Sequence, residues 1–419
     1  MNETHAIRTA ALLATGEELV RGAIVDSNSA WIARHLRGLG VELLEVRVVG
    51  DQLPVVSAAL RELCSRVDLV ITGGGLGPTA DDRTRDAIAL AAGVELRRDA
   101  AAQEQLAAYF ARFGRTPSAS NERQALLPVG ARAIPNPRGS APGIERSMGG
   151  AMLFALPGVP VELRAMFEQT VAPWIRARLT APPFVDAVLQ VVGLPESVVG
   201  ERIARWMAAQ GPPRVSDTVR FGIVTVCASD RDDATGRARL EECLSGMKAA
   251  LGDHLFAVGD RSLAEVVLEE ARAAGATLAA AESCSGGRIA AALTAIPGAS
   301  DVFVEAAVTY TAAAKMRALG VAPELVAREG VVSEAVARAM AEGIRARAAA
   351  TYGVSTTGVA GPTGGSAESP VGVVHLAVAG PDGTIAVRKH FPGDRDSIQQ
   401  FAVIGALELL RRQLRARQR

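Results

Sequence analysis

Residues 68–82 read DLVITGGGLGPTADD, an apolar run that passes directly into a glycine-rich loop and two acids. The run 68–72 predicts a buried strand, and a helical pattern follows the loop to about residue 92. Main-chain N–H groups of such a loop can bind phosphate oxygens, and Asp81 and Asp82 can hold a hard divalent cation. Acids in the first turn of a helix explain these two residues equally well. The stretch predicts part of an α/β sheet, with any ligand at the carboxyl end of the strand.

The same alternation of apolar strands and amphipathic helices extends over the first 170 residues. Further strands are expected at residues 10–14, 41–49 and 151–156. Helices are expected to begin near Asp26 or Ser27 and at Pro54, and to cover residues 100–113 and 119–127. A βαβαβ beginning of this kind predicts a three-layer α/β/α domain over residues 1–170.

The pattern changes between residues 171 and 259. A strand (184–192), a helix (196–209), a hairpin (215–228) and a second helix (232–251) predict a small α+β module whose order resembles KH-type modules. Its glycines are never three apart, so the GXXG clamp of RNA-binding KH modules is missing. We therefore expect a KH-like spacer or dimerisation module, and a homodimer.

Residues 260–419 return to α/β alternation. Strands are expected at 277–281, 302–310 and 354–356, with a hairpin turning at Pro381-Asp382-Gly383 and a closing helix from about Ser397. The sequence therefore predicts a third section that is again an α/β domain.

Composition limits the classes of function. The 419 residues carry 45 basic and 45 acidic side chains, and 49% are hydrophobic, which is typical of a folded protein. No apolar run could span a bilayer and the first residues lack a signal-peptide pattern, so we expect no membrane partner and a cytoplasmic location. Neutral charge and an aromatic content of 4% argue against a nucleic-acid partner. The cysteines and histidines have no metal-ligand spacing, so any metal must rest on carboxylates.

A serine stands where an apolar strand of the third section gives way to a helix. Residues 281–287 read AESCSGG, and main-chain N–H groups near Ser285, Gly286 and Gly287 could hold an oxyanion or a phosphate. An ordinary helix N-cap would give the same pattern. Cys284 is a rival nucleophile, but it has no histidine partner and is expected to be buried packing.

The next strand favours catalysis by Ser283. It ends at Tyr310, and Lys315, one of only three lysines in the chain, follows in the first turns of a helix capped by Thr311. Ends of neighbouring strands converge in such sheets, so Ser283, Tyr310 and Lys315 could meet. Because no histidine is near, we expect a desolvated Lys315 to take the proton of Ser283 and Tyr310 to orient these groups. A third glycine-rich stretch, around Gly361, is interpreted equally well as a ligand contact or as a surface loop.

These motifs together resemble the carboxy-terminal domain of the competence/damage-inducible CinA family. The resemblance rests on AESCSGG, Gly298-Ala299-Ser300, TYTAAAK (309–315), TGVAGPTGG (357–365) and PGDR (392–395). It implies a cofactor-free amidase that converts nicotinamide mononucleotide to nicotinate mononucleotide and ammonia, with Ser283, Lys315 and Tyr310 as catalytic residues. The substrate phosphate is expected on a helix N-terminus or on Arg395. The family usually has threonine where Ser285 stands, and Ser-Asn-Glu where this chain has Thr-Ala-Ala at 311–313.

The first section resembles the same family through GEEL (16–19), DSN (26–28), GGLGPTADDRT (74–84) and LPGVPVEL (156–163). The fold implied is that of molybdopterin-binding domains, and the activity implied is divalent-metal-dependent hydrolysis of ADP-ribose to AMP and ribose 5-phosphate. On this resemblance the metal-handling residues are Asp81, Asp82 and Glu18, and the substrate-binding glycines are Gly74, Gly75 and Gly77. The family usually has threonine where Gly73 stands.

The leading hypothesis is therefore a bifunctional hydrolase of two breakdown products of NAD. In the alternative hypothesis only the amidase is active, and the first domain is a nucleotide- or pterin-binding module.

Overall fold

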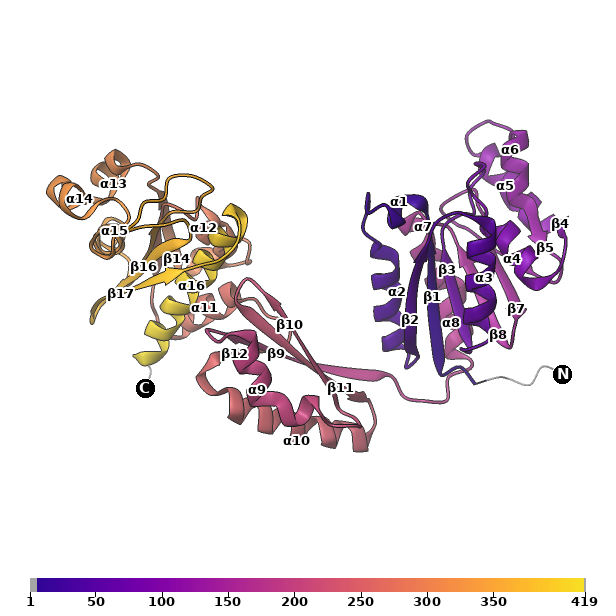
Figure 1. The fold of residues 1–419 in the computed structure, drawn as a ribbon, viewed down its shortest axis with the longest axis horizontal. Coiled ribbons are helices and arrows are strands. Elements are labelled where there is room, and N and C mark those ends of the chain that lie inside the picture. Colours follow the sequence, from indigo (N-terminus) through magenta and orange to yellow (C-terminus); the bar gives the residue numbers. More distant parts are fainter. Residues whose placement is uncertain (1–5, 418–419) are drawn as a thin grey trace. The chain divides into compact units, whose positions relative to one another are not determined.

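The computed structural model describes residues 6–417, which divide into two compact units (Figure 1). The first unit runs to Val185 and includes Arg231–Arg237, and the second holds Asp186–Asp230 and the chain from Ala238 onward. Most of the middle module therefore groups with the third section.

A six-stranded sheet forms the centre of the first unit, with strand order β2-β1-β3-β8-β7-β6. Its first four strands are parallel, and β7 and β6 are antiparallel additions at one edge. In chain order these strands are β1 (Thr9–Thr15), β2 (Glu42–Val49), β3 (Leu69–Gly73), β6 (Arg132–Ile134), β7 (Gly143–Met148) and β8 (Ala151–Leu156).

Helices cover both faces of this sheet. The helices of the first unit are α1 (Glu17–Val20), α2 (Ser27–Gly38), α3 (Leu53–Cys64), α4 (Thr84–Ala92), α5 (Ala100–Ala111), α6 (Ala119–Glu122), α7 (Pro160–Met166) and α8 (Ala172–Arg176), of which α1 and α6 bury no residue. Leu13 packs with Leu60 of α3 on one face, whereas Leu12 packs with Leu36 of α2 and Phe167 on the other. Successive residues of a strand point to opposite faces, so an all-apolar strand needs a layer on each side. The predicted three-layer α/β/α fold is confirmed.

One predicted helix of this unit is wrong. Residues 119–127 form the short helix α6, then a 3₁₀ turn and strand β5 (Leu126–Pro128), which pairs with β4 (Leu96–Arg98) in a small separate sheet. Strands β6 and β7 also lack a sequence signal, because β6 has only three residues and β7 carries the polar run Glu145–Ser147.

The middle module contains a four-stranded sheet of order β10-β11-β9-β12, packed with two helices. The strands are β9 (Phe184–Val192), β10 (Arg214–Arg220), β11 (Ile223–Arg231) and β12 (Leu255–Val258), and the helices are α9 (Glu196–Met207) and α10 (Ala234–Leu251). The hairpin between β10 and β11 turns at Phe221-Gly222, where both residues have positive φ (48° and 85°). The predicted order of elements is present, with β12 as an addition.

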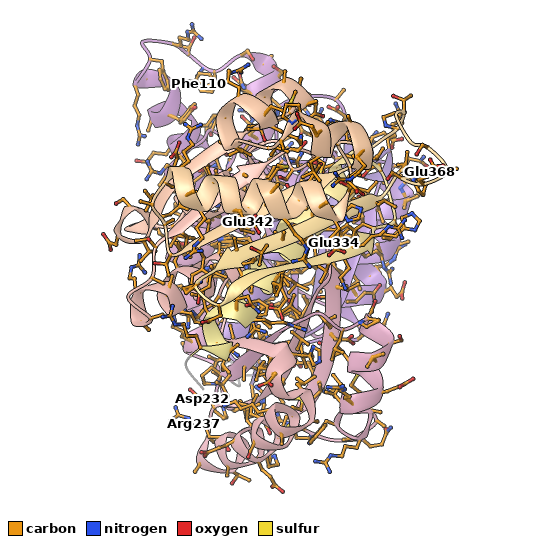
Figure 2. All side chains as sticks on the ribbon, turned by 90° about the vertical axis from the view of Figure 1, so that its left-hand side faces the viewer. Phe110, Asp232, Arg237, Glu334, Glu342 and Glu368 are labelled. Atoms are coloured by element: carbon orange, nitrogen blue, oxygen red, sulfur yellow. The ribbon has the colours of Figure 1, made fainter. Side chains whose placement is uncertain are left out.

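The third section is a five-stranded sheet of order β14-β13-β15-β16-β17. Its strands are β13 (Leu278–Glu282), β14 (Phe303–Val308), β15 (Tyr352–Gly358), β16 (Val373–Gly380) and β17 (Gly383–His390), and its helices are α11 (Leu263–Ala273), α12 (Arg288–Thr294), α13 (Ala312–Leu319), α14 (Pro323–Glu329), α15 (Glu334–Arg347) and α16 (Arg395–Ala416). Helices α11, α12 and α16 pack on one face, and α13 and α15 pack on the other. Figure 2 shows Glu334 and Glu342 along α15 where it crosses the sheet, and Glu368 in the loop after β15.

The register of this sheet brings three strand ends together. Strands β14, β13 and β15 are parallel, and Glu282 at the end of β13 lies opposite Val308 on one side and Thr356 on the other. Ser283 and Thr309, which directly follow β13 and β14, therefore lie at the level of Thr357 near the end of β15. Within residues 6–417, no helix is long and apolar enough to cross a membrane.

Candidate functional sites

Ser283 and Lys315 meet in the second unit as the sequence predicts. The main chain of Ser283 is held to β15 by its N–H, which donates to Thr356 O (3.1 Å). Thr311 caps α13 by accepting from Ala314 N (3.2 Å), and this helix directs Lys315 back toward the strand ends. Lys315 Nζ donates to Ser283 Oγ (2.8 Å) and to the main-chain oxygen of Thr309 (2.7 Å).

Burial sets the protonation of this lysine. Lys315 is only 2% exposed and Ser283 is 7% exposed. Desolvation lowers the pKa of Lys315 from 10.5 to about 8, because a charged ammonium loses its hydration in this position. In the described part of the chain, no carboxylate forms an ion pair with it. A neutral amine beside a serine hydroxyl can take its proton, which is the arrangement that a serine nucleophile requires.

Tyr310 lies in the same cavity but contacts a different group. Tyr310 is 54% exposed, and its hydroxyl oxygen accepts a hydrogen bond from Arg395, which starts α16. Arg395 also donates to the main-chain oxygen of Gly361 (2.6 Å). No hydrogen bond joins Tyr310 to Ser283 or Lys315 among the residues described. Arg395 therefore links the glycine-rich loop after β15 to the phenol of Tyr310 through hydrogen bonds to both.

These side chains line a cavity of about 230 Å³. It brings together all three predicted catalytic residues and two of the predicted substrate contacts, and its lining includes Ser283, Cys284, Tyr310, Ala312, Lys315, Thr357, Gly361 and Arg395. Cys284 is buried, and desolvation raises the pKa of its thiol to about 11, so it is held as a thiol. It therefore matches the expected packing role better than that of a nucleophile.

Glu282 changes the expected role of the loop that follows Ser283. This carboxylate is fully buried and accepts hydrogen bonds from Gly287 N (3.0 Å), Ile289 N (3.0 Å) and Ala290 N (2.8 Å), and from Ser285 Oγ (2.7 Å). A negative charge at the start of a helix is stabilised by the free N–H groups and by the helix dipole.

Two of the N–H groups expected to hold an oxyanion or a phosphate, those of Gly286 and Gly287, therefore already have partners within the protein. The N–H of Gly287 and the hydroxyl of Ser285 are engaged by Glu282, and Gly286 N donates to the main-chain oxygen of Ser283 (3.1 Å). The sequence interpretation missed Glu282, which stands between the apolar run 277–281 and Ser283, because only the Ser/Gly residues after it match a helix start. An acid directly before a Ser/Gly turn into a helix is the signal that could have revealed it.

The first unit contains a second cavity, of about 490 Å³, at the carboxyl ends of β1 and β3. All the predicted residues of the first domain line it, namely Glu18, Gly74, Gly75, Gly77, Asp81 and Asp82. Two of the glycines are required by the packing of the loop. Gly74 has φ +106°, and a Cβ on it would lie 2.5 Å from Thr15 O; Gly75 has φ +65°, and a Cβ would lie 2.2 Å from Thr84 Oγ1. The loop is thus pressed against β1 and α4.

A hydrogen bond from Thr79 lowers the pKa of Asp81 in this cavity, whereas burial raises that of Asp51. Asp82 accepts from Thr79 N (2.8 Å), and the Thr79 hydroxyl lies against both Asp81 and Asp82. Burial raises the pKa of Asp51, and the nearby charges of Glu18, Asp81 and Glu17 raise it further.

The donor set limits how a divalent cation could bind here. Among residues 6–417 there is no group of three or more acidic, histidine or cysteine side chains placed to hold a metal ion. Carboxylate oxygens such as those of Asp81 and Asp82 suit Mg²⁺ or Mn²⁺, and Mg²⁺ is commonly held by one or two carboxylates together with substrate phosphates. The residues present therefore fit a cation that is shared with a diphosphate, and not a closed cage of side chains.

Arg85, in the first turn of α4, is a further residue in contact with the glycine-rich loop that the sequence interpretation missed. Its guanidinium is buried and donates to the main-chain oxygens of Leu76 and Gly77. Desolvation lowers its pKa to about 10. A buried cation directly behind the loop holds its shape and adds positive potential to the cavity.

Comparisons with known proteins agree with these two folds. A family model for the CinA C-terminal domain matches residues 260–414, and one for a probable molybdopterin binding domain matches residues 11–177. CinA-like proteins from Frankia casuarinae and Myxococcus xanthus are each 43% identical and cover 97% of this chain, and 96% and 98% of their own. A crystal structure of the Agrobacterium tumefaciens competence/damage inducible protein is 41% identical over 36% of this chain and 93% of its own, with a TM-score of 0.36. The chain, with its molybdopterin-binding-like first domain and its CinA C-terminal domain, therefore belongs to the CinA family.

Proposed function

We propose that the third section of the chain is an amidase that hydrolyses the carboxamide of nicotinamide mononucleotide to nicotinate mononucleotide and ammonia. The observation that carries the proposal is the 2.8 Å contact between Lys315 Nζ and Ser283 Oγ in a buried site. The expectation for the family, and a cavity that also holds Tyr310 and Arg395, support it.

In the first step Lys315 removes the proton of Ser283, and the serine oxygen attacks the carboxamide carbon. Collapse of the tetrahedral intermediate expels the nitrogen, which takes the proton that Lys315 accepted from Ser283 and leaves as ammonia, so that nicotinate is left as an ester of Ser283. Lys315 then activates water, which cleaves the ester and restores the serine.

Tyr310 is the candidate donor for the intermediate. Its oxygen accepts from Arg395, so its own O–H proton is available to the cavity, and the adjacent cation makes it a better donor. Tyr310 is thus proposed to stabilise the oxyanion in place of the N–H groups of Gly286 and Gly287, which have partners within the protein.

Ammonia release from nicotinamide mononucleotide by the purified chain tests the proposal, with nicotinate mononucleotide identified as the product. Ser283→Ala should abolish release. Ser366→Ala, in the exposed part of the loop after β15, is the matched serine control and should behave like the unmodified chain. No release by the unmodified chain, or full release by Ser283→Ala, would refute the amidase.

A specific observation favours a second activity, the hydrolysis of ADP-ribose in the first unit. The 490 Å³ cavity joins a glycine-rich loop to carboxylates that suit a divalent cation shared with a diphosphate. Such a cation would neutralise the diphosphate and make it easier for water to attack. Gly74, Gly75 and Gly77 would shape the loop that holds the diphosphate, with Arg85 behind it.

Formation of AMP and ribose 5-phosphate from ADP-ribose, with Mg²⁺ or Mn²⁺ added, tests this second activity. Asp82→Asn should reduce it strongly, whereas Asp86→Asn is the control, because Asp86 lies in α4 and is paired with Arg123 (3.4 Å). Binding of ADP-ribose without turnover would instead support the alternative, in which the amidase alone is active and the first unit is a binding module.

A further inference from the structure

A second, larger cavity adjoins the proposed amidase site. It measures about 750 Å³, and Ala360 and Arg395 line both cavities. Ligand pockets usually occupy roughly 300 to 1,000 Å³, so the 230 Å³ around Ser283 is too small for a nucleotide by itself. It suits the pyridine carboxamide alone, and the rest of a nucleotide must extend past Arg395.

The second cavity offers a cation that the catalytic set does not use. Arg288, the first residue of α12, lines the second cavity and not the one around Ser283. Its side chain is 34% exposed and pairs with Asp396 (2.7 Å), which is 60% exposed. Ion pairs this exposed contribute little stability, so a dianionic phosphate can replace the carboxylate of Asp396 on the guanidinium.

Other places for the phosphate are less suitable. The N–H groups at the start of α12 are occupied by Glu282, which would also repel a phosphate. Asp394 lines the second cavity too, but its carboxylate is committed to capping α16, where it accepts from Ser397 N (2.9 Å). Arg395 has no carboxylate partner among the residues described, so it adds positive charge where the two cavities join.

We infer that Arg288 binds the 5′-phosphate of the amidase substrate in this second cavity, with Asp396 occupying the guanidinium until the substrate arrives. The inference rests on the proposed amidase function and makes it more specific. The enzyme selects a phosphorylated nucleotide over the free nucleoside through a residue outside the catalytic set.

Comparison of nicotinamide mononucleotide with nicotinamide riboside, which lacks the phosphate, tests Arg288. Arg288→Met should lower kcat/KM for the mononucleotide roughly 10- to 100-fold, mainly through KM, as expected for the loss of a charge-assisted hydrogen bond. It should change kcat/KM for the riboside less than about twofold. Asp396→Asn should lower KM for the mononucleotide, because it removes the competing carboxylate.

Arg328→Met is the control, because Arg328 also forms an exposed pair, with Glu329 (2.8 Å), and lines neither cavity. Equal losses on both substrates with Arg288→Met would mean a structural role, and no loss on the mononucleotide would place the phosphate elsewhere. Either result overturns the inference.

Binding of ribose 5-phosphate, measured by calorimetry, separates this inference from the amidase proposal. It should be at least tenfold weaker in Arg288→Met than in the unmodified chain. If neither substrate is hydrolysed but this difference appears, the amidase fails and the phosphate subsite stands. Equal binding by both chains, or binding by neither, overturns the subsite even where the amidase is active.

Discussion

The cavity around Ser283 and the cavity of the first unit differ in the titratable group whose pKa is shifted: a lysine in the first and a carboxylate in the second. In the second unit Ser283 and Lys315 are buried against each other, and loss of hydration lowers the pKa of the lysine to about 8. In the first unit burial, and then the charges of Glu18 and Asp81, raise the pKa of Asp51, so this carboxylate resists ionisation. A lysine has to be neutral before it can act as a base. A carboxylate with a raised pKa, in contrast, is stabilised in its charged form when a cation binds beside it. The first arrangement is prepared in the free protein, and the second favours binding of positive charge.

The largest expected effect is on the proposed amidase site around Ser283 and Lys315. Lys315→Met removes the proposed base, so kcat for nicotinamide mononucleotide should fall roughly 10²- to 10⁴-fold. Hydrolysis of ADP-ribose should stay within about twofold of the unmodified value, because Lys315 lies in the other unit. Lys248→Met, at an exposed lysine of α10, is the control. A Lys315→Met variant with more than half of the activity would remove the lysine from the mechanism.

The pH dependence of the amidase should show the same base. Because Lys315 must lose its proton to act and its pKa is about 8, kcat/KM should rise about tenfold per pH unit below this value and level off above it. A profile measured from pH 5.5 to 9.5 on nicotinamide mononucleotide checks this. A profile that is flat between pH 6 and 8 would contradict it.

Burial of Lys315 should also reduce stability, by a smaller amount. Its pKa is lower in the folded chain (about 8) than in the unfolded chain (near 10.5), so the unfolded state binds the extra proton between these values. The penalty is complete below pH 8 and disappears as the pH rises to about 10.5. Lys315→Met should therefore raise the free energy of unfolding of the second unit by roughly 1–3 kcal/mol at pH 7.

Denaturant unfolding of both chains at pH 7 and pH 10 measures this difference. The gain from Lys315→Met should be smaller at pH 10. An equal or larger gain at pH 10 would show that packing of the methionine, and not the lost charge, is the cause.

The smallest expected effect lies in the first unit. Asp51→Asn removes one of the crowded carboxylates and keeps an oxygen that can accept from Glu17 N (3.0 Å). The pKa of Asp51 is raised in the folded state, so its ionised form destabilises the fold at neutral pH, and the penalty disappears in acid. The variant should be more stable by roughly 0.3–1 kcal/mol at pH 7 and equal at pH 3. Thermal unfolding of the first unit at both values checks this, and lower stability at pH 7 would show that the charge is used in the free protein.

The sequence predicts most of the fold and the central pair of the site for clear physical reasons. Apolar runs followed by Ser/Gly or Gly-rich loops mark the strand ends, and parallel strands bring those ends together, so Ser283 and Lys315 are predictable although 32 residues separate them. Thr311 is recognisable as the cap that orients α13.

The rest depends on contacts that no local pattern carries. The hydrogen bond from Arg395 to Tyr310 joins residues that are 85 positions apart in the sequence. Glu282, the last residue of β13, accepts hydrogen bonds from the loop that follows Ser283 and so holds that loop in place. Residues 119–127 have the composition of a helix, but tertiary pairing of β5 with β4 overrides it. Arg85 is typical of an exposed first-turn residue, and only the close packing of the loop on α4 encloses it.

The scarcity of lysine in this chain gives the buried amine a practical consequence. Lys248, Lys315 and Lys389 are the only side-chain amines that an amine-directed acylating reagent can modify, and Lys248 and Lys389 are exposed. Unprotonated amines are the reactive form, so the lowered pKa of Lys315 makes it nucleophilic at a lower pH than a lysine with the ordinary value of 10.5, although its burial slows access. Mass spectrometry of three acylated peptides could thus follow the titration of the active-site amine on the unmodified chain, and a bound nucleotide should shield that peptide alone.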